Sequence, residues 1–246
     1  MNRIVIEGLR AGYGAVSVLH DVSIEVREAE LVALLGTNGN GKSTLLNCIM
    51  GLVRPTAGRI RMEWAGRAAE LTGRAPHQIV ELGVGFVPEG RRLVPNLTVE
   101  ENLILAGSGR RVRVQLKQNL AHCYETFPIL AERRRQHAAT LSGGQQQLLA
   151  IARALMTSPR VIVIDEPSVG LAPIVVDQVI RAIRELQRSR NLTILMAEQS
   201  FFQTIEIATR TYVLSQGRII RAFDHGSDRV THEELSRAML GVGGDL

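Results

Sequence analysis

The sequence Gly36-Thr37-Asn38-Gly39-Asn40-Gly41-Lys42-Ser43 decides the fold expected for this 246-residue chain, because it fits the spacing G-x-x-x-x-G-K-[ST]. The residues before it, 31–35, are continuously apolar and predict a fully buried strand. From Lys42 onward, apolar residues recur with helical spacing until Gly51. A strand, a glycine-rich turn and a helix in succession are the context that a phosphate-binding loop requires.

This loop contains the groups that hold a triphosphate. Its glycines let backbone N–H groups turn inward without a Cβ in the way, and the following helix adds unpaired N–H groups and the positive end of its dipole. Lys42 can reach the β- and γ-phosphates, and the Ser43 hydroxyl can bind Mg²⁺. A glycine-rich turn without a ligand is the alternative, which the buried strand and the Lys-Ser-Thr run disfavour. The predicted nucleotide-binding residues are Gly36, Thr37, Asn38, Gly39, Asn40, Gly41, Lys42, Ser43 and Thr44.

A second apolar run, residues 161–164, ends in Asp165-Glu166. Acidic side chains at the carboxyl end of a buried parallel strand stand where ligands bind in open α/β sheets. Asp165 is placed to hold Mg²⁺ directly or through water, and Glu166 to orient the attacking water or take its proton. An ordinary turn at Asp165-Glu166-Pro167 is the alternative, and the phosphate loop favours the metal and catalytic roles.

Leu141-Ser142-Gly143-Gly144-Gln145 precedes a strongly helical stretch, residues 146–156. Ser142 and the two glycines make a helix N-terminus that can face an anion. A chain with one lysine-containing loop needs no second phosphate cradle of its own, so we expect this one to serve a γ-phosphate held by a partner subunit. An N-cap serine followed by a flexible turn is the alternative.

The alternation of strands and helices predicts a largely parallel α/β sheet with crossovers. Residues 103–130 are helical, charged and interrupted by Gly107, Gly109 and Pro128. We therefore expect an inserted helical subdomain at 89–157, between core segments 1–88 and 158–246. Residues 175–186 carry one apolar helix face. The remaining expected strands are 3–7, 22–26, an edge strand at 58–62, 83–87, 192–197 and 212–214.

Composition narrows the class of protein. Apolar residues make up 45% of the chain, but no run approaches the ~18 needed to span a bilayer. No basic and apolar leader opens the chain, so we expect it in the cytosol. Cys48 and Cys123 form no C-x-x-C and are expected to be inert buried thiols. The net charge of +5 fits solvated helix faces, and 4% aromatic residues argue against a nucleic-acid partner.

At these motifs the chain resembles the ATP-binding cassette (ABC) ATPases, over nearly its whole length. The resemblance implies a P-loop NTPase core with a mixed, largely parallel sheet, an antiparallel β subdomain and an inserted helical subdomain. It also implies two ATP molecules with Mg²⁺ sandwiched in a head-to-tail dimer. There, the loop and Asp165-Glu166 of one subunit face the Leu141–Gln145 signature of the other. Tyr13, in Ala11-Gly12-Tyr13-Gly14, matches the family's aromatic residue that stacks on adenine.

Two positions depart from the general family pattern. Glu89 stands where the family usually has a glutamine that touches Mg²⁺, and Gln199 stands where a histidine usually reaches the γ-phosphate. Glu89 can still offer an oxygen to Mg²⁺, and Gln199 can still donate a neutral N–H bond. The predicted catalytic residues are therefore Glu166 and Gln199, and the predicted metal ligands are Ser43, Asp165 and Glu89.

The departures resemble one subgroup, the smaller ATPase subunit of branched-chain amino acid importers. The segments that carry this likeness are 88–92 with the following 96–102, 168–173, and Ala197-Glu198-Gln199. The likeness implies a second ABC ATPase as partner, in a homo- or heterodimer, and two membrane permease subunits. A periplasmic binding protein delivers the amino acid in such systems. The chain would then lie peripherally on the cytoplasmic face of the bacterial inner membrane.

Three other functions remain open from the sequence. One is ATPase of a urea or amide importer. The second is ATPase of a lipid or lipopolysaccharide exporter, which would normally carry the glutamine and histidine that positions 89 and 199 lack. The third is a soluble, non-transport cassette ATPase, although this chain has one phosphate loop and no sustained heptads. The tail 225–246 has no assigned role beyond a polar helix face at Glu233, Glu234 and Arg237.

Because the Gln199 side chain does not titrate, we predict that ATP turnover shows no histidine titration arising from this position. The measurement is the pH dependence of the turnover rate. A limb with an apparent pKa near ~6.5 that disappears in Gln199→Ala would contradict the assignment.

Overall fold

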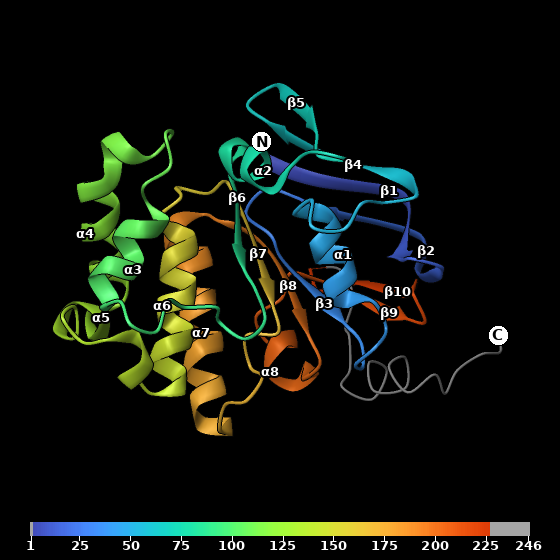
Figure 1. Ribbon diagram of the computed structural model, residues 1–246. Coiled ribbons are helices and arrows are strands. Elements are labelled where there is room, and N and C mark those ends of the chain that lie inside the picture. Colours follow the sequence, from blue (N-terminus) through green and yellow to red (C-terminus); the bar gives the residue numbers. More distant parts are fainter. Residues whose placement is uncertain (1, 227–246) are drawn as a thin grey trace.

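The computed structural model describes residues 2–226, and within them the chain forms two β-sheets and the helices that cover them (Figure 1). The predicted polar helix face in the tail lies outside these residues. The strands are β1 (Asn2–Tyr13), β2 (Val16–Val26), β3 (Leu31–Leu35), β4 (Ala57–Trp64), β5 (Arg67–Glu70), β6 (Val84–Val87), β7 (Val161–Asp165), β8 (Thr193–Glu198), β9 (Arg210–Ser215) and β10 (Arg218–Asp224). The helices are α1 (Lys42–Ile49), α2 (Pro76–Leu82), α3 (Val99–Ala106), α4 (Leu116–Thr126), α5 (Pro128–Glu132), α6 (Gly143–Leu155), α7 (Pro173–Arg190) and α8 (Phe201–Ile205), with 3-10 turns η1 (Arg113–Gln115) and η2 (Ala138–Thr140).

The larger sheet has the strand order β10-β9-β3-β8-β7-β6, and all its pairings are parallel except β10 with β9. Successive residues of β3 face opposite sides: Leu31, Ala33 and Leu35 pack into one core, and Val32 and Leu34 into another. Both faces are covered, so β3 reads as a continuous apolar run, as the sequence predicted. Because β3, β8 and β7 are parallel, their carboxyl ends meet at one edge.

The smaller sheet is antiparallel, with the order β2-β1-β4-β5. Its apolar face packs with α1 against the larger sheet, forming one continuous core that includes Ile4, Leu45 and Leu34. The mixed α/β fold with a parallel core sheet and an antiparallel β subdomain is therefore confirmed.

The prediction of an edge strand at 58–62 is wrong. This segment lies in β4, which is paired on both sides, with β1 and with β5. Alternation of charged and apolar residues shows that a strand is half-buried, but it does not show how many neighbours the strand has. Here Arg59, which is exposed, and Arg61, which is half-buried, pair with Glu7 of β1; Arg61 Nη2 lies 3.2 Å from Glu7 Oε1. The missed edge strand is β5, whose sequence Arg67-Ala68-Ala69-Glu70 has no strand-like pattern.

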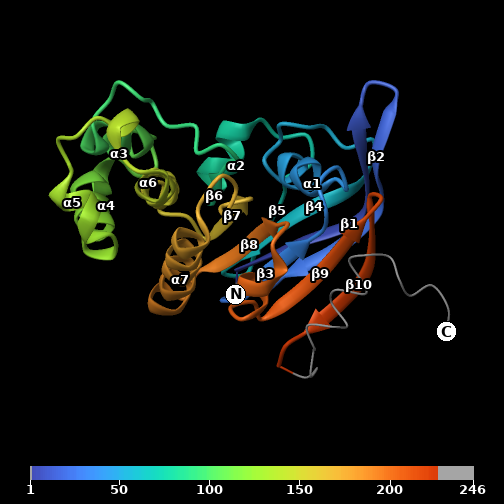
Figure 2. The same ribbon diagram turned by 90° about the horizontal axis from the view of Figure 1, so that it is seen from below.

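Helices α3 to α6 gather at one side of the molecule, and the antiparallel sheet lies at the other (Figures 1 and 2). The first of them, α3, begins earlier than the expected 103, because Thr98 caps it: its Oγ1 accepts from Glu101 N at 3.2 Å and its N–H donates to Glu101 Oε2 at 2.8 Å. The expected apolar face of α7 is buried except at Val175, which is half-buried. None of the helices in residues 2–226 combines the length and apolar character needed to cross a bilayer.

Both cysteines are buried, and neither is in a disulfide. Burial raises the pKa of the Cys48 thiol to about 12, and it does the same for Cys123. A thiol that stays protonated at neutral pH is a poor nucleophile, which agrees with the prediction of inert cysteines.

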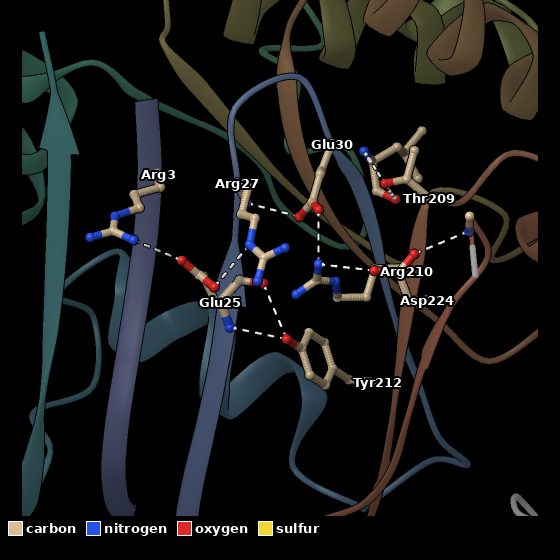
Figure 3. Close-up of polar contacts among 10 residues, drawn as sticks. Arg3, Glu25, Arg27, Glu30, Thr209, Arg210, Tyr212 and Asp224 are labelled. Carbon is tan, nitrogen blue, oxygen red and sulfur yellow. Dashed lines mark hydrogen bonds and ion pairs between the residues drawn. The ribbon is translucent and has the colours of Figure 1, made fainter. Parts of the chain in front are cut away.

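Polar side chains tie the two sheets together where β2 passes β9 (Figure 3). The Tyr212 hydroxyl accepts from the backbone N–H of Glu25 at 3.2 Å and donates to its carbonyl at 3.3 Å. Since β2 is an edge strand, these backbone groups have no neighbouring strand on that side. Beside them, Arg210 pairs with Glu30 at 3.1 Å. A tyrosine hydroxyl thus takes the place of a ladder partner between the sheets.

We predict that Tyr212→Phe lowers the free energy of unfolding by about 1–2 kcal/mol, because it leaves both Glu25 backbone groups without their partner. Urea unfolding of both chains gives the difference. The matched control is Tyr13→Phe, which removes the hydroxyl of a tyrosine that is 52% exposed and should change stability by less than about 0.5 kcal/mol. Equal stability of Tyr212→Phe and the wild-type chain would contradict this role.

Candidate functional site

The phosphate loop connects the end of β3 to the start of α1, and two of its glycines are required by the packing around it. A Cβ on Gly36 would lie 2.4 Å from the carbonyl oxygen of Leu214 on the neighbouring strand β9. Gly41 has a φ of 100° and would place a Cβ 2.8 Å from Leu19 Cδ2. The left-handed backbone at this point turns the chain into α1, so the loop is held in shape by its neighbours.

Asn40 fastens this loop to the β9–β10 turn. Its side-chain oxygen accepts from Gln216 N at 2.7 Å, and its carbonyl accepts from Gly217 N at 3.2 Å. Its side-chain nitrogen donates to Thr37 Oγ1 at 2.6 Å. The amide of Asn40 is therefore engaged within the protein, and the loop is braced from outside by a turn far away in the sequence.

Lys42 is 3% exposed and donates to three oxygens around it. Its Nζ lies 2.8 Å from Gly36 O, 3.3 Å from Thr37 O and 3.0 Å from Glu166 Oε1. A buried ammonium and a buried carboxylate offset each other's desolvation only while they stay paired. The lysine of the loop and the acid at the end of β7 therefore form one electrostatic unit.

The carboxylate of Asp165 lies beside this pair and accepts from Ser43 Oγ at 3.2 Å. The pKa of Asp165 is raised to about 6, chiefly by burial and also by the nearby Glu166 and Glu89, while Ser43 and Lys42 act in the opposite direction. A cluster of carboxylate and hydroxyl oxygens that disfavours its own negative charge is a donor set that suits a hard divalent cation such as Mg²⁺.

Lys42, Ser43 and Glu166 open onto a hollow of about 380 Å³. It brings together the loop, the end of β7, the segment after β6 and strand β2. Its lining residues are Val18, Asn38, Gly39, Gly41, Lys42, Ser43, Thr44, Glu89 and Glu166. The sequence predicted all of them except Val18, which belongs to a half-buried strand and carries no chemical motif.

Six predicted residues do not line this hollow. Four of them belong to the phosphate loop or to the end of β7: Gly36, Thr37, Asn40 and Asp165. The other two are Tyr13 and Gln199. Tyr13 lies at the end of β1, in the hairpin whose other strand brings Val18 to the hollow. Gln199 directly follows β8 and is exposed; its backbone N–H donates to Glu198 Oε2 at 3.1 Å. Neither side chain therefore forms part of the hollow that Lys42 and Glu166 border.

The signature residues Leu141–Gln145 are also absent from the lining of this hollow. Ser142 caps α6: its Oγ accepts from Gln145 N at 3.4 Å, and its N–H donates to Gln145 Oε1 at 3.1 Å. The glycines are closely covered, since a Cβ on Gly143 would lie 3.1 Å from Leu171 Cδ2 and one on Gly144 2.5 Å from Val175 Cγ1. This capped turn is separate from the chain's own phosphate loop.

The fold and the loop together define a P-loop nucleotide-hydrolysing protein. Residues 19–169 match the family model described as "ABC transporter", and the chain belongs to this family. It is an ATP-binding ABC ATPase, in which ATP hydrolysis is coupled to transport, as the sequence predicted.

Individual relatives agree with this family. The "High-affinity branched-chain amino acid transport ATP-binding protein BraG" of Pseudomonas aeruginosa is 43% identical, over 93% of this chain and 95% of its own. The ADP conformation of the ATP-binding cassette MJ1267 has a TM-score of 0.78 at 27% identity and covers 96% of this chain and 94% of its own. The cassette MJ0796, a dimeric structure, has a TM-score of 0.76 at 24% identity, with 90% and 98% covered.

We predict that Asp165→Asn stabilises the metal- and nucleotide-free chain at pH 8 by up to about 3 kcal/mol. The folded-state pKa of about 6 lies above the ordinary 3.8, so ionising Asp165 costs stability as the pH rises through this window. The gain should therefore shrink as the pH falls and vanish near pH ~4.

Urea unfolding with chelator at several pH values measures this gain. The control is Asp21→Asn, which changes an exposed carboxylate and should shift stability by less than about 0.5 kcal/mol at any pH. A gain for Asp165→Asn that is independent of pH would contradict the burial argument.

Proposed function

We propose that this chain is the smaller ATPase subunit of a branched-chain amino acid importer. The ATPase part is supported by one observation above others: Lys42, Ser43 and Glu166 border the same hollow. The transport substrate is supported by the likeness to BraG over nearly the full length of both chains and by Glu89 and Gln199, the subgroup's variants.

ATP would enter with its phosphates against the backbone N–H groups of the loop and the N-terminus of α1. Lys42 now donates to loop carbonyls and to Glu166; the β- and γ-phosphates offer it stronger acceptors. When Lys42 turns to the phosphates, Glu166 loses its cation. Nucleotide binding would in this way free the carboxylate for a catalytic task.

Glu166 then acts as the general base: its carboxylate accepts a proton as water attacks the γ-phosphorus. Gln199, exposed at the end of β8, would donate a side-chain N–H bond to a γ-phosphate oxygen. Ser43, Asp165 and Glu89 would hold Mg²⁺, which neutralises charge on the β- and γ-phosphates.

The Leu141–Gln145 turn would complete the site of a second ATPase subunit. Ser142 and the α6 N-terminus offer N–H and hydroxyl donors to an anion, and this turn lies apart from the chain's own loop. Two subunits would then close around two ATP molecules. To swing such an equilibrium from 1:99 to 99:1, ATP must favour the closed state by ~5.5 kcal/mol.

The helical segment 89–157 would carry the coupling to two membrane permease subunits at the cytoplasmic face of the inner membrane. Between this segment and the core is a groove of about 290 Å³, whose lining includes Phe86, Arg91 and Arg153. Arg91 donates to Gln146 Oε1 at 3.1 Å, next to the signature turn. A permease segment bound in the groove would therefore contact Arg91, which lines the groove and also donates a hydrogen bond to α6. A periplasmic binding protein would act only through the permeases.

We predict that Glu166→Gln keeps ATP affinity within about twofold but lowers turnover at least about 100-fold, because the general base is lost. ATP should then trap a closed dimer, seen by light scattering. In a strain that lacks the chromosomal copy, this variant should fail to restore uptake of labelled leucine, isoleucine and valine, whereas the wild-type chain restores it.

Each result separates the proposal from its alternatives. Full turnover of Glu166→Gln would remove that residue from the base role. Restored uptake of urea but not of leucine would indicate the amide importer, and a lipopolysaccharide export defect would indicate the exporter. Failure of the chain to co-purify with any membrane permease would favour a non-transport cassette ATPase.

A further inference from the structure

A buried carboxylate that the proposed reaction does not use lies at the end of β8. Glu198 is 1% exposed, and no described cation forms an ion pair with it. Its oxygens instead accept three hydrogen bonds: from Ser168 N at 3.0 Å, from Ser168 Oγ at 2.8 Å and from Gln199 N at 3.1 Å. Burying an acid is costly, and the hydrogen bonds that compensate for it here come from Ser168 and Gln199.

One of these residues, Ser168, controls the backbone that carries Glu166. Glu166 has a φ of 43°, a left-handed conformation that is strained for a non-glycine residue. Its N–H donates to Ala197 O at 3.0 Å, just before Glu198, and its carbonyl accepts from Val169 N at 3.3 Å. The strained residue is thus held between β8 on one side and the turn fixed by Ser168 on the other.

The turn formed by residues 168–171 also contacts the signature turn, Leu141–Gln145. Leu171 N donates to Ser168 O at 3.2 Å, which folds the segment 168–171 back on itself. The Leu171 side chain covers Gly143, where a Cβ would lie 3.1 Å from Leu171 Cδ2 and 3.4 Å from Arg91 Nη2. A continuous path of contacts therefore runs from Glu198 through Ser168 and Leu171 to the turn proposed to serve the partner's ATP.

We infer that Glu198 is a positioning residue that, through Ser168, fixes both Glu166 and the Leu141–Gln145 turn of the same chain. Glu198 is buried, and it acts by holding the segment 166–171 against the end of β8. The inference rests on the proposed roles of Glu166 and of the signature turn. It adds that one buried carboxylate sets the geometry of this chain's contributions to two different ATP sites.

The test removes only the hydroxyl that Glu198 accepts from. Ser168→Ala should lower kcat about tenfold, the factor expected for one hydrogen bond to a charged group, while KM and the ATP dissociation constant stay within about twofold. Ser168→Thr keeps the hydroxyl and should restore at least about half of the wild-type kcat. Hydrogen exchange should become faster in residues 166–171 and in the signature turn, but not in α1.

The matched control is Ser200→Ala, which removes the hydroxyl two residues beyond Glu198. Ser200 Oγ bonds to Gln203 at 3.0 Å, not to Glu198, so kcat should stay within about twofold. The second probe is Glu198→Gln, which should also lower kcat. The double variant Ser168→Ala/Glu198→Gln should lose less kcat than the product of the two single fold-losses, because both substitutions disrupt the same Ser168–Glu198 contact.

Wild-type kcat in Ser168→Ala would overturn the inference, and so would a fall in kcat that Ser168→Thr does not rescue or that comes with lost ATP binding. Measuring Glu166→Gln in parallel distinguishes failure of the positioning role of Glu198 from failure of the proposed base role of Glu166. If Glu166→Gln is inactive while Ser168→Ala is normal, only the positioning role fails. If it is active, the base role fails and the positioning role fails with it.

Discussion

The parallel pairing of β3, β8 and β7 is the constraint on which the rest of the structure depends. The register places Leu35 opposite Glu198 and Asp165 opposite Ala197, so three chain segments far apart in sequence end at one edge. The phosphate loop leaves the sheet at this edge, and the carboxylates arrive there. Chemistry at the edge is possible because both faces of the sheet are buried and cannot shift without opening the core.

The charged side chains at this edge are stabilised by contacts with one another and not by contact with solvent. Lys42 and Glu166 are held together out of solvent, and Asp165 has its pKa raised by the same burial. The Lys42–Glu166 pair is stable only as a pair, because loss of either partner leaves the other charge uncompensated. A triphosphate with Mg²⁺ supplies both signs of charge that the cluster can exchange for its internal contacts. The contacts among Lys42, Glu166 and Asp165 and the proposed catalytic contacts therefore use the same charged groups.

The segment after β6 connects this network to the helical segment. The loop after β6 carries Glu89 into the hollow, and two residues later Arg91 bonds to α6. Arg91 and Arg92 both adopt positive φ, so this short connection holds backbone strain beside the groove. A shift of the residues that line the groove would therefore displace both Glu89 and the signature turn.

The sequence by itself determined the phosphate loop, the strand-end acids, the signature turn and a largely parallel α/β sheet, because each is encoded by a local pattern of glycine, charge or apolar spacing. The antiparallel β subdomain was expected only from the family resemblance. The sequence patterns placed β4 at an edge and missed β5, because a single strand's pattern does not reveal its neighbours. Only the tertiary structure decided that Val18 borders the hollow, that Tyr212 bridges two sheets, and that Glu198 holds Ser168. Each of these contacts joins residues that are distant in sequence, and their geometry follows from strand pairing and packing, which no local pattern specifies.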